Sequence, residues 1–447
     1  MKILTNLTFL ALLIGACSQP PSDQSAMVEA SFPERAKDMV IYEVNVRQYT
    51  PEGTFNGFID HLPRLEELGV DILWVMPIQP IGEEKRKGGL GSYYSIKDYT
   101  AINPEFGSME DFKRLVDEAH KKDMLVILDW VANHTAWDHP WMEKDGYHTK
   151  DSMGNVISPV PDWSDVADLN YENMDMQNEM IDALQYWVEE ADIDGYRCDV
   201  AGFVPMEFWN RAKDSLDVVK DVFMLAEWDE PQMHEDAFHM TYGWGLHHYM
   251  NGVAKGEKNV DSLISFINKD LDRYPSDAFR MNFTTNHDEN SWNGTVFERF
   301  GDGHKAYAVF VFTVQGMPLI YSGQEAGLDE RLAFFEKDTI EWGDVAFQEF
   351  YASLVDLKHD NPALYNGEFG GEPNFMDTGN PMVIAYERTK DNNQVTVVIN
   401  LSGDNQSISL PESMLFTDVF SEGDVSSSIT EMQPYQYFVG TNTVSNE

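Results

Sequence analysis

Cysteine is almost absent from this sequence. The 447 residues contain two, Cys17 and Cys198. Cys17 falls at the end of an N-terminal leader, so Cys198 is left without a partner for an internal disulfide. The mature fold must therefore be stabilised by packing, and a small secreted scaffold held together by disulfides is excluded.

Basic residues are also scarce. The chain has 31 Lys and Arg against 76 Asp and Glu, which gives a formal net charge of −45. A field of this sign repels nucleic acids and anionic membrane surfaces. The composition therefore predicts no nucleic-acid partner and favours a substrate that is neutral or cationic.

Long hydrophobic runs are missing except at the N-terminus. Residues 1–17 (MKILTNLTFLALLIGAC) place a lysine before an apolar run that is too short to span a bilayer, which is typical of a secretory signal peptide. The segment 14–17 (IGAC) resembles a bacterial lipobox, which implies lipidation of Cys17. Residues 18–35 are rich in Ser, Pro and Gln and are predicted to be a flexible tether. We expect a protein lipid-anchored in a bacterial cell envelope, facing the periplasm or the outside. The alternative is a plain signal peptide that contains a cysteine.

The body of the chain alternates between strand-like and helix-like segments. Eight β-rich segments are visible, of which 238–242 is the weakest, and the others are 39–46, 71–78, 124–130, 193–198, 222–226, 280–286 and 317–321. Alternating β and α units in this number favour a closed parallel barrel over an open sheet. We predict a (β/α)8 TIM barrel over residues 36–358.

Two regions depart from this alternation. Residues 134–172 are polar, aromatic and irregular, and they predict a short excursion domain after the third strand. Beyond a helix near 346–358 the chain changes to short strands with polar turns, predicted at 382–388, 394–401, 407–410 and 415–420. We expect residues 359–447 to form a C-terminal antiparallel β domain.

Carboxylates and histidines gather after the predicted barrel strands. The segments are DWVANH (129–134), GYRCD (195–199), AEW (226–228) and NHD (286–288). Each alone has an ordinary structural explanation, such as an ion pair, a solvated acid or a helix cap. In this type of barrel, however, the carboxyl ends of the strands meet at one rim and carry the active site. Four such segments in order therefore predict a catalytic cluster.

These segments resemble the signature regions of the α-amylase superfamily, glycoside hydrolase family 13. VADLN (166–170), SYYSIKDY (92–99) and GQE (323–325) add to the likeness, which covers roughly residues 38–360 and implies a bacterial α-amylase-like lipoprotein. The resemblance implies that Asp199 is the nucleophile and that Glu227 is the general acid and then the general base. It implies that Asp288 holds the sugar at the cleavage subsite.

The same resemblance implies a set of substrate-binding residues. Arg197, His134 and His287 would bind around the cleavage subsite, and Tyr94 would stack on the sugar ring. Asp98 and Asp129 match the family as well, but a structural role in holding loops and strands explains them more simply.

The chemistry of the pair is clear without the family. A retaining glycosidase needs two carboxyls about 5–5.5 Å apart, one as nucleophile and one as acid. Arg197 precedes Asp199 by two residues and so shares its strand face, and its charge should keep Asp199 ionised. Glu227 must begin protonated, which a neighbouring charge or a low dielectric can achieve.

The predicted function is hydrolysis of α-1,4-glucosidic bonds in starch, glycogen or maltooligosaccharides, with an α-glucan as the substrate partner. One alternative is a family-13 transglycosylase or an exo-acting enzyme for small oligosaccharides. Another is a non-catalytic glycan-binding lipoprotein, which the presence of Asp199, Glu227 and Asp288 disfavours.

We expect no essential cofactor. Many α-amylases carry a Lys-His pair shortly after the nucleophile, and its His joins a calcium site, whereas Asp199 here is followed by Val, Ala, Gly and Phe203. A calcium ion is usually coordinated by about 6–8 oxygen ligands. The resemblance implies that Asn133 could offer an oxygen, and Asp162, Asp165 and Asp168 in the excursion domain could contribute others. The sequence therefore predicts no tightly held calcium, with Phe203 packing where a metal would otherwise join the excursion domain to the barrel.

Overall fold

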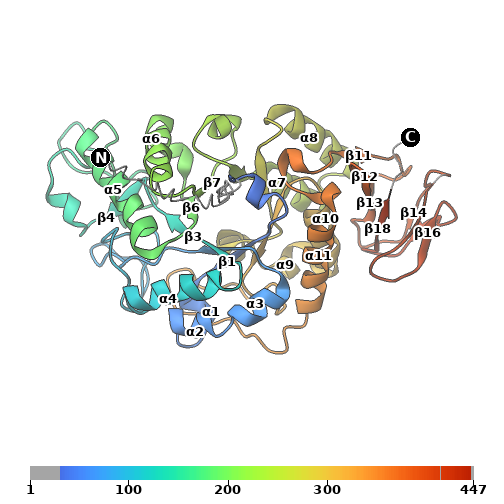
Figure 1. Cartoon of the computed structure of the whole chain (residues 1–447), viewed down its shortest axis with the longest axis horizontal. Helices are drawn as coiled ribbons and strands as arrows, with labels where there is room; N and C mark the ends of the chain where they lie inside the picture. The colour runs from blue at the N-terminus through green and yellow to red at the C-terminus, as the bar shows by residue number, and fades with distance from the viewer. Residues whose placement is uncertain (1–30, 413, 444–447) are drawn as a thin grey trace, which may run out of the picture. The chain divides into compact units, whose positions relative to one another are not determined.

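The computed structural model describes residues 31–412 and 414–443 (Figure 1). The predicted signal peptide, the lipidation site at Cys17 and most of the predicted tether lie outside the described residues. The described residues form one compact unit.

A closed barrel of eight parallel strands forms the centre of this unit, in the spatial order β1-β10-β9-β8-β7-β6-β3-β2. The strands are β1 (Ile41–Val44), β2 (Ile72–Val75), β3 (Leu125–Trp130), β6 (Gly195–Cys198), β7 (Phe223–Ala226), β8 (Met240–Tyr242), β9 (Phe279–Asn282) and β10 (Met317–Tyr321). The predicted TIM barrel is confirmed, including the strand expected from the weak segment 238–242.

Side chains alternate along each barrel strand between the interior and the surrounding helices. The interior is filled by a separate cluster of buried apolar residues that includes Ile41, Trp74, Ile127, Phe279 and Leu319. The outward residues join the larger core beneath the helices. Because the interior is packed solid, polar groups can meet only at the ends of the strands.

The helices lie around the barrel (Figure 1). Those between the strands include α2 (Phe55–Ile59), α3 (Leu62–Leu68), α4 (Met109–His120), α5 (Met174–Ala191), α6 (Met206–Asp217), α7 (Trp244–Ala254), α8 (Val260–Arg273), α9 (Val296–Phe300), α10 (His304–Thr313) and α11 (Gln348–Asp360). The start of α4 shows how local sequence sets these bounds. The Ser108 hydroxyl accepts a hydrogen bond from the Asp111 amide, and the Asp111 carboxylate accepts one from the Ser108 amide. This pair of bonds is a capping box.

The segment after β3 is an irregular excursion held at its base by two short antiparallel strands. These are β4 (His134–Ala136) and β5 (Val166–Asp168), and they pair His134 with Asp168. The pairing brings both ends of the excursion back to the carboxyl rim of the barrel. His134 is thereby fixed at the edge of the cleft.

An antiparallel β region follows α11, as predicted. Its main sheet has the order β11 (Pro373–Phe375), β12 (Val383–Lys390), β13 (Asn393–Asn400) and β18 (Tyr437–Thr443). Two small pairs accompany it, β14 (Gln406–Ser407) with β17 (Glu431–Met432) and β15 (Leu415–Thr417) with β16 (Asp424–Ser426). The sequence did not predict β11, β16, β17 or β18.

One buried arginine joins this β region to the barrel. Arg388 on β12 is completely buried, and its guanidinium donates to the carbonyls of Thr313 and Val314 at the end of α10. It also donates to the carbonyls of Gly371 and Tyr365 in the connecting segment. The last turn of a barrel helix is thus capped from the C-terminal region.

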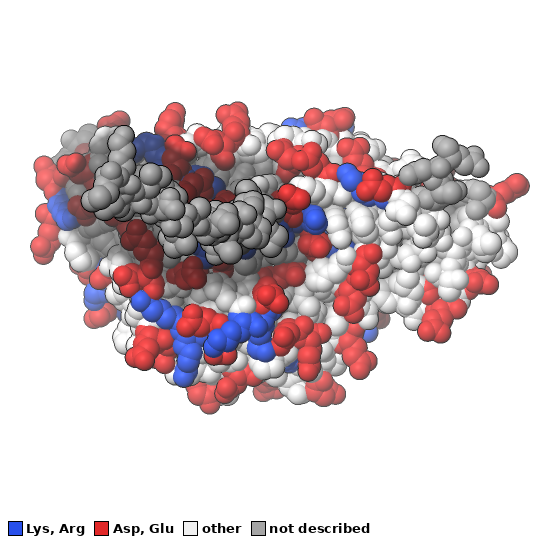
Figure 2. All heavy atoms as spheres, viewed as in Figure 1, with Lys and Arg blue, Asp and Glu red and all other residues white. Residues whose placement is uncertain are grey.

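Acidic side chains are scattered over the face shown in Figure 2, and basic ones are fewer. None of the helices that the structure describes is long and apolar enough to cross a membrane.

Candidate active site

Three carboxylates surround one buried arginine at the carboxyl rim. Arg197 is fully buried, and its Nη1 lies 3.0 Å from Asp129 Oδ1 and 3.1 Å from Asp199 Oδ1. Its Nη2 lies 2.9 Å from Glu227 Oε1. The predicted nucleophile and the predicted acid therefore share a single cation, because β6 and β7 are neighbouring strands and end at the same height.

Burial changes the proton affinity of both acids. It raises the pKa of Asp199 to about 6, against the opposing effect of Arg197. Burial, opposed by Arg197 and assisted by the charge of Asp199, raises the pKa of Glu227 to about 7. Burial thus favours retention of a proton on this coupled pair. A pair that holds one proton provides one carboxylate and one carboxylic acid, which is the division that nucleophile and acid require.

The backbone after Asp199 is strained and points at Glu227. Val200 has φ +35°, a left-handed conformation that is rare for a β-branched residue. Its amide donates to Glu227 Oε2 over 2.8 Å. Strain of this kind persists where the surroundings enforce it. Here it orients the carboxyl of Glu227 from the strand that carries Asp199.

Asp129 holds the Arg197 guanidinium in this arrangement. Its side chain is fully buried and accepts hydrogen bonds from Arg197 Nη1, Trp74 Nε1 and the Tyr94 hydroxyl. With no exposed surface, it holds Arg197 and does not face a ligand. Its placement agrees with the structural role expected from the sequence.

Tyr94, His287 and Asp288 lie together in the pocket that Asp199 and Glu227 line. The Tyr94 hydroxyl lies 2.9 Å from His287 Nε2, and the two rings stack with centroids 5.6 Å apart. The Asp288 carboxylate lies 3.3 Å from His287 Nε2 and remains partly exposed. Three of the residues predicted around the sugar are thus brought together, whereas Arg197 is fully buried beneath the carboxylates.

Glu43, at the end of β1, was missed by sequence reasoning. Its carboxylate is fully buried and accepts from His287 Nδ1 over 2.5 Å. Burial opposes a charge on His287, but Asp288 and Glu43 outweigh it and raise the pKa of His287 to about 9. His287 is therefore an imidazolium at neutral pH, with an N–H on each ring nitrogen. The sequence feature that could have identified Glu43 is a glutamate inside an otherwise apolar strand.

These groups line a pocket of about 470 Å3, within the range of about 300–1,000 Å3 typical of ligand sites. His134 forms part of its wall, where burial lowers its pKa to about 4 and its ring lies 5.7 Å from that of Trp163. Other lining residues were not predicted, namely Lys87, Trp163, Trp292, Phe334 and Phe335. The aromatic rings among these residues can pack against the flat faces of sugar rings.

A groove continues the pocket on the side of Glu227. It is lined by Val200, Glu227, Trp228, Asp229, Glu230 and Trp244. Phe203 stands at its edge with 48% of its surface exposed, 5.6 Å from the ring of Trp228 and 6.1 Å from that of Trp163. Phe203 thus contacts both the barrel and the excursion, as the sequence predicted.

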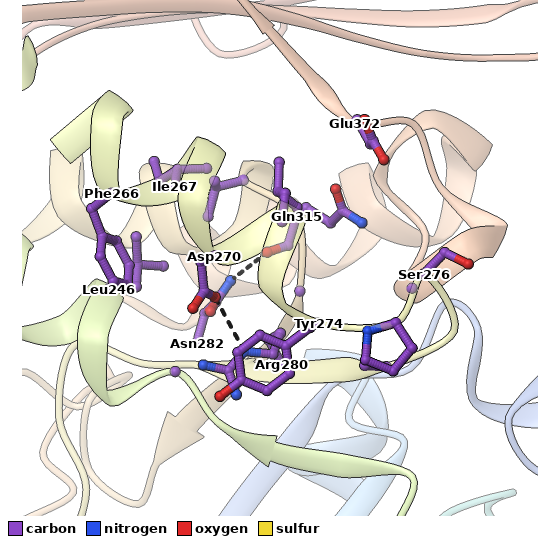
Figure 3. Close-up of a pocket in the computed structure, with 17 residues that line it drawn as sticks. Leu246, Phe266, Ile267, Asp270, Tyr274, Ser276, Arg280, Asn282, Gln315 and Glu372 are labelled. Carbon is purple, nitrogen blue, oxygen red and sulfur yellow. Dashed lines mark hydrogen bonds and ion pairs between the residues drawn. The ribbon is translucent and has the colours of Figure 1, made fainter. Parts of the chain in front are cut away.

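A second, smaller cavity of about 100 Å3 lies beside α8 and β9 (Figure 3). Arg280 lies in it with Nε 3.3 Å from Asp270, and its Nη2 also lies 2.5 Å from Asp229. None of the predicted site residues lines this cavity. The ion pair with Arg280 holds Asp229 in place, and Asp229 follows Glu227 by two residues.

Two of the residues considered for calcium have other contacts. Asp165 is paired with Lys87 at 3.1 Å, and the Asn133 amide nitrogen faces His134 Nδ1. Within residues 31–412 and 414–443, no group of three or more His, Cys, Asp or Glu side chains could hold a metal ion. That no tightly held calcium is needed stays a prediction.

Comparisons with known proteins agree with this geometry. Residues 26–155 and 161–407 match the family model for the α-amylase catalytic domain, and residues 383–436 match that for the α-amylase SusG C-terminal domain. The α-amylase MalA of Haloarcula japonica is 28% identical over 410 residues, which cover 87% of this chain and 59% of that protein. A cyclomaltodextrinase from a Bacillus species is also 28% identical, over 86% of this chain and 78% of its own length.

Solved structures show the same likeness. An α-amylase from Lactobacillus plantarum superposes with a TM-score of 0.81 at 30% identity, covering 91% of this chain and 99% of its own. The noncanonic maltogenic α-amylase AmyB from Thermotoga neapolitana does so with a TM-score of 0.82 at 31% identity and the same coverage.

Proposed function

Because this chain belongs to the α-amylase family, we propose that it is a retaining glycoside hydrolase that cleaves α-1,4-glucosidic bonds of starch, glycogen or maltooligosaccharides. One observation carries the proposal. Asp199 and Glu227 end neighbouring strands and share Arg197, and burial raises the pKa of both carboxyls.

The reaction follows from the placement of these two carboxyls. Protonated Glu227 gives its proton to the glycosidic oxygen while the Asp199 carboxylate attacks the anomeric carbon. The C–O bond to the leaving sugar breaks as an ester bond to Asp199 forms. Glu227, now a carboxylate, takes a proton from water, and the resulting hydroxide displaces Asp199. Two inversions leave the product with the α configuration of the substrate.

Tyr94, His287 and Asp288 hold the sugar that receives this attack. Asp288 accepts from ring hydroxyls, and His287, whose N–H groups face Glu43 and Tyr94, positions Tyr94 and Asp288 beside the sugar. Tyr94 covers one face of the ring, and His134 bounds the pocket from the excursion. Arg197 keeps the negative charge of Asp199 stable in its buried position.

Replacement of the nucleophile tests the proposal. Asp199→Asn should abolish release of reducing ends from amylose while leaving glucan binding intact, because an amide keeps the shape but is a poor nucleophile. Asp117→Asn, an exposed change on α4, is the matched control and should behave as wild type. NMR of fresh wild-type product should show the α-anomer. Wild-type turnover by Asp199→Asn, or early β-anomer, would overturn the assignment.

Transglycosylation is a second candidate activity. The groove beyond Glu227 carries Trp228 and Trp244, which can hold an acceptor sugar in place of water. Longer oligosaccharides formed from concentrated maltotriose would support it, and their absence would refute it.

We also propose that the protein acts at the cell envelope, anchored by a lipid on Cys17. The lipobox-like sequence before Cys17 supports this location.

A further inference from the structure

The loop of residues 83–91, here called the bridging loop, is fastened on one side to the excursion. The Glu83 amide donates to Asp138, and the Lys85 ammonium lies over the ring of Trp137. Lys87 forms an ion pair with Asp165 at 3.1 Å, and Asp165 is almost fully buried. The loop is thus held to the excursion along half of its length.

The other half of the bridging loop is fastened to the segment that follows β10. The Gly89 amide donates to Glu336 Oε1 over 2.6 Å, and the Leu90 amide donates to the Phe335 carbonyl over 3.0 Å. The loop therefore spans from the excursion to the opposite wall, which are formed by parts of the chain about 170 residues apart in sequence.

Two glycines make this close approach possible. Gly88 has φ +64°, and a Cβ added there would overlap the Cβ of Phe335. A Cβ added at Gly89 would overlap the Glu336 carboxylate. Any larger residue at Gly88 would push the loop away from Phe335 and would also be strained in the left-handed region.

The bridging loop closes one end of the catalytic pocket. Lys87, Phe334 and Phe335 all line the pocket that contains Asp199 and Glu227. The groove of Trp228 and Trp244 leaves from the other side, beside Glu227. Since Glu227 protonates the leaving sugar, that groove takes the leaving group. The closed end therefore faces the part of the substrate that stays on Asp199.

We propose that the bridging loop makes this enzyme exo-acting, so that it removes one short product of constant length from the non-reducing end of α-glucan chains. This inference rests on the proposed glycosidase function. A chain with its non-reducing end free can enter the pocket until it meets Lys87 and Phe335. A longer glycone would have to pass through the contacts between the bridging loop and both walls. The pocket volume of about 470 Å3 suits a ligand about the size of a disaccharide.

Maltoheptaose and maltoheptaose capped at the non-reducing 4- and 6-hydroxyls form the test pair. Wild type should release one short product from the free substrate throughout the digestion and cleave the capped one at least tenfold more slowly. If wild type cleaves both at similar rates into mixed lengths, the exo proposal fails while the glycosidase function stands. If it cleaves neither, the glycosidase function itself fails.

Variants then test the loop itself. Lys87→Ala removes the tie to Asp165, and the double change Lys87→Ala/Gly88→Ala also disturbs the contact with Phe335. We expect the relative rate on the capped substrate to rise at least tenfold in the double variant. Lys113→Ala, which removes an ion pair with Glu190 on the outer surface, is the matched control and should change nothing. Variants that keep the wild-type Tm and still reject the capped substrate would overturn the proposal.

Discussion

Glu43→Gln should remove one of the two carboxylates that stabilise the charge of His287, leaving Asp288, without changing the shape of the site. The Glu43 carboxylate lies 2.5 Å from His287 Nδ1, and both groups are buried. Opposite charges about 4 Å apart interact by about 4 kcal/mol at an effective dielectric of 20. One pH unit of pKa corresponds to about 1.4 kcal/mol. Because the amide oxygen still accepts a hydrogen bond, we expect the pKa of His287 to fall by about two pH units.

The pH dependence of kcat/KM measures this change. In wild type the alkaline limb should follow loss of the Glu227 proton, whose pKa is about 7, because the pKa of His287 is about 9. In Glu43→Gln both groups deprotonate over the same range, so the slope of log kcat/KM should steepen from −1 towards about −2. NMR of 15N-labelled histidine reports the His287 titration directly. Glu110→Gln, an exposed change on α4, is the control.

Stability provides an independent check with a defined sign. The pKa of His287 is raised above its ordinary value of 6.5, so its contribution is complete below pH 6.5 and is lost as the pH rises through about 9. That loss is about 3 kcal/mol in wild type and should be much smaller in Glu43→Gln. If His287 titrates at the same pH in both proteins, the assignment of Glu43 as a positioning residue is wrong.

Two further predictions concern the N-terminus and calcium. Cys17→Ser should move the protein from the membrane fraction to the soluble fraction, because stable anchoring requires the acyl chains that this cysteine would carry; equal membrane retention of variant and wild type would refute the anchor. Dialysis against EDTA should change activity and Tm very little, because Asp165 and Asn133 have other contacts; a loss of many degrees that added calcium restores would show that other oxygens complete a site.

Much of the barrel could be predicted because its strands are short apolar runs separated by amphipathic helices. Where a strand carries little apolar surface, the signal fails. The strand β18 is half exposed and contains Gly440 and two threonines, and β11 is three residues long with a proline. Their place in the sheet is set by pairing with β12 and β13, which local sequence does not encode.

The residues of the site also differ in whether the sequence could predict them. Asp199, Glu227 and Asp288 could be located because each follows a strand, and strand ends in a barrel meet at one rim. Glu43 lies within an apolar strand and was read as part of it. The contacts of Lys87 with Asp165 and of Gly89 with Glu336 join distant loops, and no spacing in the sequence relates these positions.

The bonds of Arg388 bear on how this protein could have been assembled during evolution. A module that can be exchanged freely leaves its neighbour complete when it is removed. Here the guanidinium of Arg388 supplies donors to the carbonyls of Thr313 and Val314, which end a helix of the barrel. Loss of the C-terminal sheet would leave those carbonyls and a buried apolar face without partners. The two parts are therefore expected to be inherited together, and a relative that has exchanged its C-terminal sheet must have replaced this cap.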